Sequence, residues 1–356
     1  MKLLDLFFDA YDKIHQTLRL PSSSKPASSG FLSRIIPAGI LVVILLLLVL
    51  SFLWGSEPER FDPVQAATQL AAERNEQLAT GYITTTALIK VSETLLNKPG
   101  GYLSNDVLPP GVFMDNIPNW EFGVLTQVRD LSLALRNDIS RSQSQSIEDK
   151  DIIAAENQFR IDSTSWMLPP AESEYQKAID GLTSYLTRLS DDNAQDAQFY
   201  TRADNLNDWL GLITKRLGSL SQRLSASVGQ ARINTDLGGD ANAQQSTPTS
   251  KVIEAQTPWF KIDDVFYEAR GSAWALSILL RAVETDFQEV LQNKNAQVSV
   301  QQIIRELEAT QDTVWSPVIL NGGGFGLFAN HSLVMANYIS RANAAVLDLQ
   351  QLLKQG

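Results

Sequence analysis

Apolar residues in four parts of the chain recur at alternating steps of four and three positions. Because an α-helix completes a turn in about 3.6 residues, this spacing gathers the apolar side chains into one narrow stripe on the helix. Helices with such stripes pack side by side at shallow angles. The pattern therefore predicts four long helices that bury their stripes against one another, within residues 175–189, 199–224, 262–290 and 335–353.

Weaker helical patterns lie near residues 64–97, 121–142, 147–162 and 299–314. No alternating run of β-branched residues is long enough to compete with them as a sheet. The stripes are interrupted often and contain Ala and aromatic residues, which favours a compact antiparallel bundle over an extended dimeric coiled coil. We expect an all-α domain over residues 57–356, an antiparallel helical bundle with long irregular loops. Homo-oligomerisation through one exposed stripe stays open.

Residues 229–257 interrupt the helical pattern with a polar stretch that contains no aromatic residue. A loop of this length is unusual inside a compact domain. We expect a flexible loop between two helices. The alternative is a boundary between two subdomains, residues 57–228 and 258–356.

Residues 35–54 form an uncharged and strongly apolar run. A helix of this length rises about 30 Å, which matches the hydrocarbon thickness of a bilayer. The alternative is a cleaved signal peptide, whose apolar core is usually shorter and closer to the start of the chain. We expect a single N-terminal transmembrane helix that stays attached, so that the lipid bilayer is one partner.

Charge is distributed unevenly on the two sides of this run. Residues 1–34 carry a net charge of +2 and the rest of the chain carries −13, which together give the formal net charge of −11. Cationic flanks stay in the cytoplasm, so we expect a cytoplasmic N-terminus and a periplasmic domain. The acidic domain argues against nucleic acid as a partner, and a chain without Cys has no disulfides and no Cys-ligated metal.

The segment before the apolar run has two parts. Residues 2–20 repeat apolar side chains at helical spacing, and residues 21–30 are rich in Ser and Pro. The first part predicts an amphipathic helix that lies on the inner leaflet or against a partner. The second predicts a flexible tether.

One irregular segment, residues 99–122, is far more apolar than a helix connection requires. Two consecutive prolines give it an extended backbone. The segment either lies in a groove of its own bundle or forms a surface that recognises another protein. The candidate interaction residues are Tyr102, Leu108, Pro109, Pro110, Phe113, Met114 and Trp120.

Motifs for catalysis or metal binding are missing from the sequence. His331 is the only His after residue 34, no Gly-x-Ser-x-Gly occurs, and the acidic groups lack the spacing of a calcium loop. The segment 163–175 reads as a helix break followed by a new helix start, and residues 321–331 as a Gly-rich turn in which Asn330 caps the last helix. We expect no catalytic residues, no metal and no cofactor.

Four long irregular strings resemble an uncharacterised proteobacterial family of inner-membrane-anchored proteins known as a domain of unknown function. The resemblance covers most of residues 30–356 and implies a Gram-negative inner-membrane protein, but it assigns no activity and no site residues. The strings are GGYLSNDVLPPGVFMDNIPNWEFG at 100–123, SWMLPPAESEY at 165–175, FYEARGSAWAL at 266–276 and FANHSLVMANYISRANAAVLDL at 328–349.

These observations favour a non-enzymatic single-pass inner-membrane protein whose periplasmic helical bundle binds or scaffolds envelope or inner-membrane proteins. The first alternative is a periplasmic sensor of a small ligand that acts through a cytoplasmic partner. The second is an envelope hydrolase that depends on a carboxylate, for which Glu121 beside Trp120 is the candidate.

Overall fold

The structure is a computed structural model that describes residues 32–141, 147–191, 196–233, 252–316, 318–323 and 326–355. The described residues are mostly helical, which confirms the predicted all-α class. The tail predicted over residues 1–34 lies outside the described part, apart from the first turn of the first helix. The same holds for residues 234–251, the middle of the predicted polar loop.

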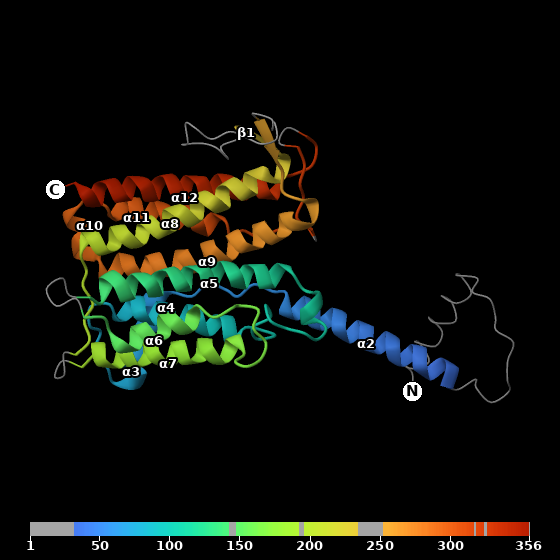
Figure 1. Cartoon of the computed structure of the whole chain (residues 1–356), viewed down its shortest axis with the longest axis horizontal. Helices are drawn as coiled ribbons and strands as arrows, with labels where there is room; N and C mark the ends of the chain where they lie inside the picture. The colour runs from blue at the N-terminus through green and yellow to red at the C-terminus, as the bar shows by residue number, and fades with distance from the viewer. Residues whose placement is uncertain are drawn as a thin grey trace, which may run out of the picture.

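The N-terminal helix α2 (Leu32–Trp54) projects from one end of the other helices (Figure 1). Its segment Ile35–Trp54 is long and apolar enough to cross a membrane, and none of it is buried in the protein. The helix begins earlier than the sequence predicts, so Pro37 lies beyond its first turn, and the missing Pro37 N–H leaves the Ser33 carbonyl oxygen without its intrahelical donor. The predicted apolar helix is therefore present as a continuous element, and its last residue, Trp54, packs against the domain.

The remaining helices lie side by side with their long axes roughly aligned (Figure 1). Successive long helices reverse direction from one end of the domain to the other. The elements are α3 (Pro63–Arg74), α4 (Tyr82–Asn97), α5 (Asn116–Ala134) with a π-helical last turn (Leu135–Ile139), α6 (Lys150–Phe159), α7 (Ala171–Leu189), α8 (Ala203–Ser225), α9 (Ile262–Asp286), α10 (Gln288–Asn293), α11 (Gln297–Ala309) and α12 (His331–Lys354). Short 3-10 turns cover Gly111–Phe113, Ala226–Val228 and Trp259–Lys261.

All four predicted stripes are buried along their central parts. The stripe residues of α12 and the central stripe residues of α7 and α8 are buried, while the opposite faces are polar. The short polar stretch at residues 191–196 predicts a turn that makes α7 and α8 antiparallel neighbours. In the structure they pack elsewhere: α7 packs against α4 and α6, and α8 against α12 and α5. The stripes therefore predict which faces are buried, but not which helices meet.

Helix α9 differs from its prediction because almost every residue in its middle is buried, not one stripe alone. Small residues occupy the faces between the large ones, and they let neighbouring helices approach from several sides. Gly271 of α9 lies against the backbone of Trp120, and Gly123 of α5 lies against the backbone of Glu268. Helices α5 and α9 thus pack closely and in parallel, at the centre of the domain (Figure 1).

The buried side chains from α3 to α12 form one hydrophobic cluster that runs from Ala67 to Leu353. Polar groups also connect distant elements: the Asp286 carboxylate at the end of α9 accepts hydrogen bonds from the N–H groups of Gly81 and Thr84, at 3.0 and 2.7 Å. These bonds cap the start of α4, where an α-helix has unpaired N–H groups. The start of α4 and the end of α9 are therefore joined at one end of the domain.

A small feature that the sequence did not predict is a two-stranded antiparallel ladder. Strands β1 (Gln230–Ile233) and β2 (Val252–Ala255) pair from Gln230 with Ala255 to Ile233 with Val252. The ladder lies at the same end of the domain as α2 (Figure 1). We call this end of the domain the α2 end.

Candidate functional site

The segment that follows α2 is fixed to the domain by an ion pair between Glu57 and Arg270. The Arg270 guanidinium donates to the Glu57 carboxylate through Nε and Nη2, at 2.8 and 2.6 Å. Its Nη1 donates to the carbonyl oxygens of Thr310 and Asp312, at 3.0 and 2.9 Å. One nearly buried side chain of α9 therefore joins the segment after α2 to the segment after α11.

Aromatic side chains reinforce this junction. The Trp274 indole donates to the Pro58 carbonyl oxygen at 3.0 Å, and its ring lies 5.1 Å from that of Trp120. Trp54, the last residue of α2, covers Gly100: a Cβ placed there would lie 2.7 Å from the Trp54 ring. Because Gly100 also has a φ of +86°, only glycine fits this position without strain. Helix α2 consequently leaves the domain in a defined direction.

The apolar segment between α4 and α5 is organised around a buried carboxylate. Glu121 pairs with Lys98 at 2.6 Å and accepts hydrogen bonds from the N–H groups of Leu103 and Ser104, at 2.9 and 2.8 Å. Burial raises the pKa of the Glu121 carboxyl, and the Lys98 charge opposes that shift. Glu121 thus holds the loop backbone in place and does not face solvent.

The structure divides the seven predicted interaction residues into an inner and an outer group. Tyr102, Pro110 and Trp120 are buried. The Tyr102 hydroxyl donates to the Ser163 carbonyl oxygen at 3.1 Å, and its ring packs edge-on against Tyr175. These three residues anchor the segment on its own domain, which agrees with the first of the two predicted readings.

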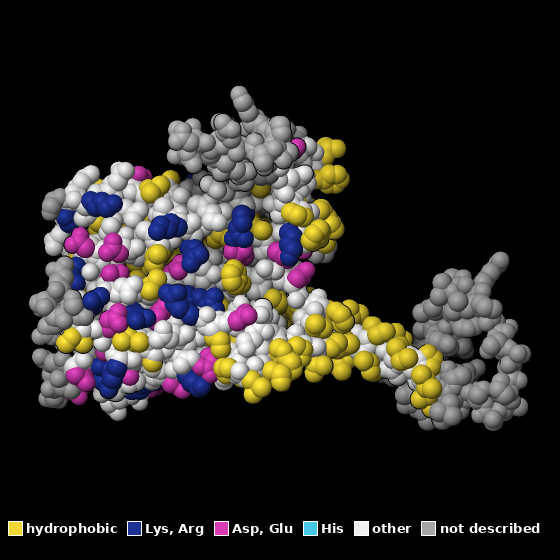
Figure 2. Space-filling view, viewed as in Figure 1, with side chains coloured by type: hydrophobic (Ala, Val, Ile, Leu, Met, Phe, Trp, Pro, Cys, Tyr) yellow, Lys and Arg dark blue, Asp and Glu magenta, His cyan; other side chains and the backbone are white. Residues whose placement is uncertain are grey.

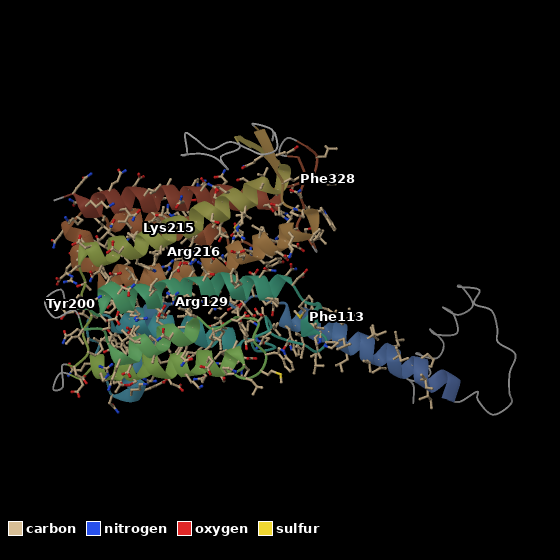
Figure 3. The ribbon with its side chains drawn as sticks, viewed as in Figure 1. Phe113, Arg129, Tyr200, Lys215, Arg216 and Phe328 are labelled. Atoms are coloured by element: carbon tan, nitrogen blue, oxygen red, sulfur yellow. The ribbon has the colours of Figure 1, made fainter. Side chains whose placement is uncertain are left out.

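The outer group faces solvent beside α2. Leu108 and Phe113 are 73% and 79% exposed, and Pro109 between them is also exposed. Met114 is half-buried and reaches toward Gly55, the residue after α2. Figure 3 shows Phe113 next to the point where α2 joins the domain. The segment therefore has a packed inner side and an exposed apolar rim.

Other exposed apolar residues gather at the same end, and the sequence reading missed them. They lie on three further connections, α6 to α7, β2 to α9 and α11 to α12. Figure 2 shows apolar side chains along this end and along α2, while charged side chains are spread over the long sides. A search for aromatic residues outside the helical stripes would have found most of this set, which is Trp166, Met167, Leu168, Trp259, Phe260, Trp315, Leu327 and Phe328.

Two adjacent cavities open at the α2 end. The first has a volume of about 450 Å³, and its lining includes Phe266, Trp315 and Tyr338. The second, of about 640 Å³, lies beside the residues that follow α2. The two cavities share Arg270, Thr313 and Val314, so the junction with α2 forms the wall between them.

His331 lies in the wall of the first cavity, and its hydrogen bonds join the two ends of the Gly-rich segment. The imidazole Nδ1 accepts a hydrogen bond from the Leu320 backbone N–H at 3.2 Å, and the backbone N–H of His331 donates to the Leu320 carbonyl oxygen at 3.0 Å. Burial lowers the pKa of the imidazole. Asn330 caps α12 by accepting from the Leu333 N–H at 2.8 Å, which confirms the predicted cap.

Within the described residues, no group of three or more Asp, Glu or His side chains is arranged to hold a metal ion. A family model described as an uncharacterized protein conserved in bacteria (DUF2333) matches residues 29–356. No curated protein and no solved structure matches the chain.

Proposed function

Since the chain belongs to the DUF2333 family of uncharacterised bacterial proteins, we propose that it is a single-pass inner-membrane protein whose periplasmic, antiparallel helical bundle binds or scaffolds other envelope proteins. In this proposal the protein is not an enzyme. The two side chains that the sequence offered for chemistry, Glu121 and His331, both hold backbone groups of their own domain. Their hydrogen bonds support a structural role for each.

The packing at the end of α2 supports an anchor rather than a cleaved signal peptide. Trp54 lies on Gly100 and Glu57 is bound by Arg270, so the residues after the apolar run belong to the folded domain. A cleavage site also needs two small residues spaced as in A-x-A, and residues 51–57 contain no such pair. The orientation follows from the cationic segment before α2, which favours a cytoplasmic N-terminus.

The observation that carries the scaffolding proposal is the rigid junction between α2 and two cavities. A tether that is fixed by Arg270 and Trp274 holds the cavities at a constant place relative to the membrane. The lining of the first cavity includes Phe266 and Tyr338, and aromatic residues contribute much of the binding energy of protein interfaces. We expect a segment of a neighbouring envelope protein to occupy it.

Photo-cross-linking in living cells tests this proposal. A photoreactive phenylalanine at Val334 or Tyr338 would face the first cavity, and the same group at Leu347 provides the control on the outer part of α12. We expect the two cavity positions to yield one shared cross-linked protein, identified by mass spectrometry, and Leu347 to yield none. Filling the cavity with Ala309→Phe should abolish the product. Identical products at all three positions would contradict the proposal.

The first cavity also supports a second function, the sensing of a small ligand. Its volume lies within the range of about 300 to 1,000 Å³ that small-molecule sites occupy. A ligand that binds the folded state raises the unfolding temperature. A thermal-shift screen of the full chain in detergent with common periplasmic solutes should then show stabilisation that Ala309→Phe removes. A screen without any stabilising solute would count against sensing.

A further inference from the structure

Exposed aromatic residues on the loops of the domain are confined to the α2 end. Among the described residues they lie on the α4–α5, α6–α7, β2–α9 and α11–α12 connections at this end, whereas the α2–α3 connection has none. The exposed large apolar residues on the connections at the opposite end are aliphatic, namely Leu78 and Ile147, with Val298 in the first turn of α11. Figure 3 places Phe113 and Phe328 on opposite sides of the α2 end. The set, which we call the aromatic rim, is Phe113, Trp166, Trp259, Phe260, Trp315 and Phe328.

We propose that the aromatic rim inserts into the interfacial layer of the lipid bilayer that α2 spans, so that the bundle stands with its α2 end in the membrane surface. This inference rests on the proposed anchor and adds a second, independent contact with lipid. Trp side chains favour the boundary between headgroups and acyl chains, and Phe accompanies Trp on protein surfaces that insert into this layer. An exposed apolar patch of this kind marks a contact surface.

The position of α2 selects the bilayer as the occupant rather than a protein partner. The outer group of the α4–α5 segment flanks the last turn of α2, and the Met114 side chain lies next to Gly55. Because no residue of the apolar segment of α2 is buried in the domain, a bilayer spanned by α2 has its surface at the level of Gly55 and of the side chains beside it. From there the rim extends to Phe328 on the other side of the α2 end (Figure 3).

The chemistry of the rim points to apolar insertion rather than to recognition of anionic headgroups. In Figure 2 the Lys and Arg side chains are spread over the long sides of the domain, and the α2 end is mainly apolar. A surface that depended on anionic lipid would need a cluster of cations. Binding should therefore persist in zwitterionic lipid and at high salt.

The backbone at Leu168 agrees with this role. Leu168 has a φ of +57° and is 89% exposed, between Trp166 and the start of α7. A left-handed conformation is strained for leucine, and glycine or asparagine would adopt it more easily. The fold thus keeps a large apolar side chain exposed at a backbone position that glycine or asparagine would occupy more easily, which fits a contact with lipid.

The experiment uses spin labels on the full chain in vesicles of zwitterionic phosphatidylcholine. The protein has no Cys, so single substitutions place one label each. We choose Leu108→Cys, Met167→Cys and Leu327→Cys, which are exposed neighbours of the rim and leave its aromatic residues intact. Val298→Cys at the opposite end is the water-exposed control, and Leu46→Cys within α2 is the lipid-exposed control.

We expect the ratio of the collision rate with oxygen to that with a water-soluble nickel complex to be several-fold higher at the three positions beside the rim than at Val298. If the labels beside the rim give the same ratio as Val298 while the label at Leu46 is in lipid, the inference is overturned and the proposed anchor is still supported. A water-exposed Leu46 would overturn the anchor itself. Rim labels that are shielded from both reagents would also overturn the inference, because they would indicate a protein contact, either a partner or a second copy of the chain.

Discussion

At the scale of single residues, the Arg270 side chain joins the segment after α2 to the segment after α11. Replacing it with Met removes the partner of the partly buried Glu57 carboxylate, and breaking such a pair costs about 3–5 kcal/mol. We expect R270M to lower the free energy of unfolding by this amount in urea titrations in detergent. The double variant E57Q/R270M should be less destabilised than R270M, because it leaves no unpaired charge. Equal losses in both variants would mean that the ion pair does not join α2 to the domain.

His331 makes the stability of the same end depend on pH. Burial lowers the pKa of its imidazole below the ordinary value of 6.5. The unfolded chain therefore takes up a proton at this site before the folded chain does, and the stability that His331 contributes is lost as the pH falls below about 6.5 toward the folded pKa. Protonation also removes the Nδ1 acceptor that the Leu320 N–H uses.

Two measurements check the pH dependence. An NMR titration of the His331 imidazole should give a pKa below 6.5. The difference in unfolding free energy between the natural chain and H331Q should shrink between pH 7 and pH 5, because the glutamine does not titrate, whereas carboxylates titrate equally in both proteins. A constant difference across this range would contradict the assigned role.

The residues of the α4–α5 segment show what the sequence can and cannot predict at this scale. Its apolar composition correctly indicates that the segment packs on something. Tyr102 is buried and Phe113 is exposed because of the path that the backbone takes between them. The pair of Lys98 and Glu121, at the two ends of the segment, fixes that path. No local spacing encodes such a clamp, so the inner and outer residues could not be separated from the sequence.

At the scale of elements, the contact between α5 and α9 depends on two glycines. A Cβ on Gly271 would lie 2.0 Å from the Trp120 carbonyl oxygen, and one on Gly123 would lie 2.1 Å from the Glu268 carbonyl oxygen. Neither backbone can give way without separating the helices. We expect G271A and G123A each to lower the free energy of unfolding by about 1–3 kcal/mol, measured by thermal or urea unfolding.

The matched control is G211A in α8. The nearest atom to a Cβ at Gly211 is a flexible side-chain nitrogen of Gln350 at 3.6 Å, so no clash arises. Because alanine favours the helix over glycine, we expect this variant to gain about 0.5–1 kcal/mol. Opposite signs for G271A and G211A would confirm that close approach, and not helix propensity, decides the outcome. Equal signs would contradict it.

The same two helices explain why some elements were predicted better than others. Helices α7, α8 and α12 each have one polar and one apolar face, and their buried residues follow from the spacing. In α9 the faces between the large residues carry Gly271, Ser272 and Ala275, which are neutral in a hydrophobicity pattern and buried in the fold. Pairing of helices depends on such small residues, so the neighbours of α9 could not be predicted from its stripe.

At the scale of the whole molecule, the charge separation across α2 leads to a prediction about topology. The segment before α2 carries +2 and the segment after it −13, and cationic flanks are retained in the cytoplasm. The acidic domain should therefore lie in the periplasm. The cavities and the aromatic rim would then face the outer leaflet of the inner membrane.

Cysteine labelling of cells tests this topology, again because the natural chain has no Cys. Leu347→Cys on the exposed face of α12 should react with a membrane-impermeant maleimide in intact spheroplasts. Ser23→Cys, before α2, should react only after the inner membrane is permeabilised.

The mass of the membrane-bound protein should include residues 1–34, since the junction at Glu57 and Arg270 belongs to the folded domain. Reversed labelling would invert the orientation and still leave α2 as an anchor. A membrane-free protein that begins after Trp54 would identify the apolar helix as a signal peptide, and the aromatic rim would then need a partner other than lipid.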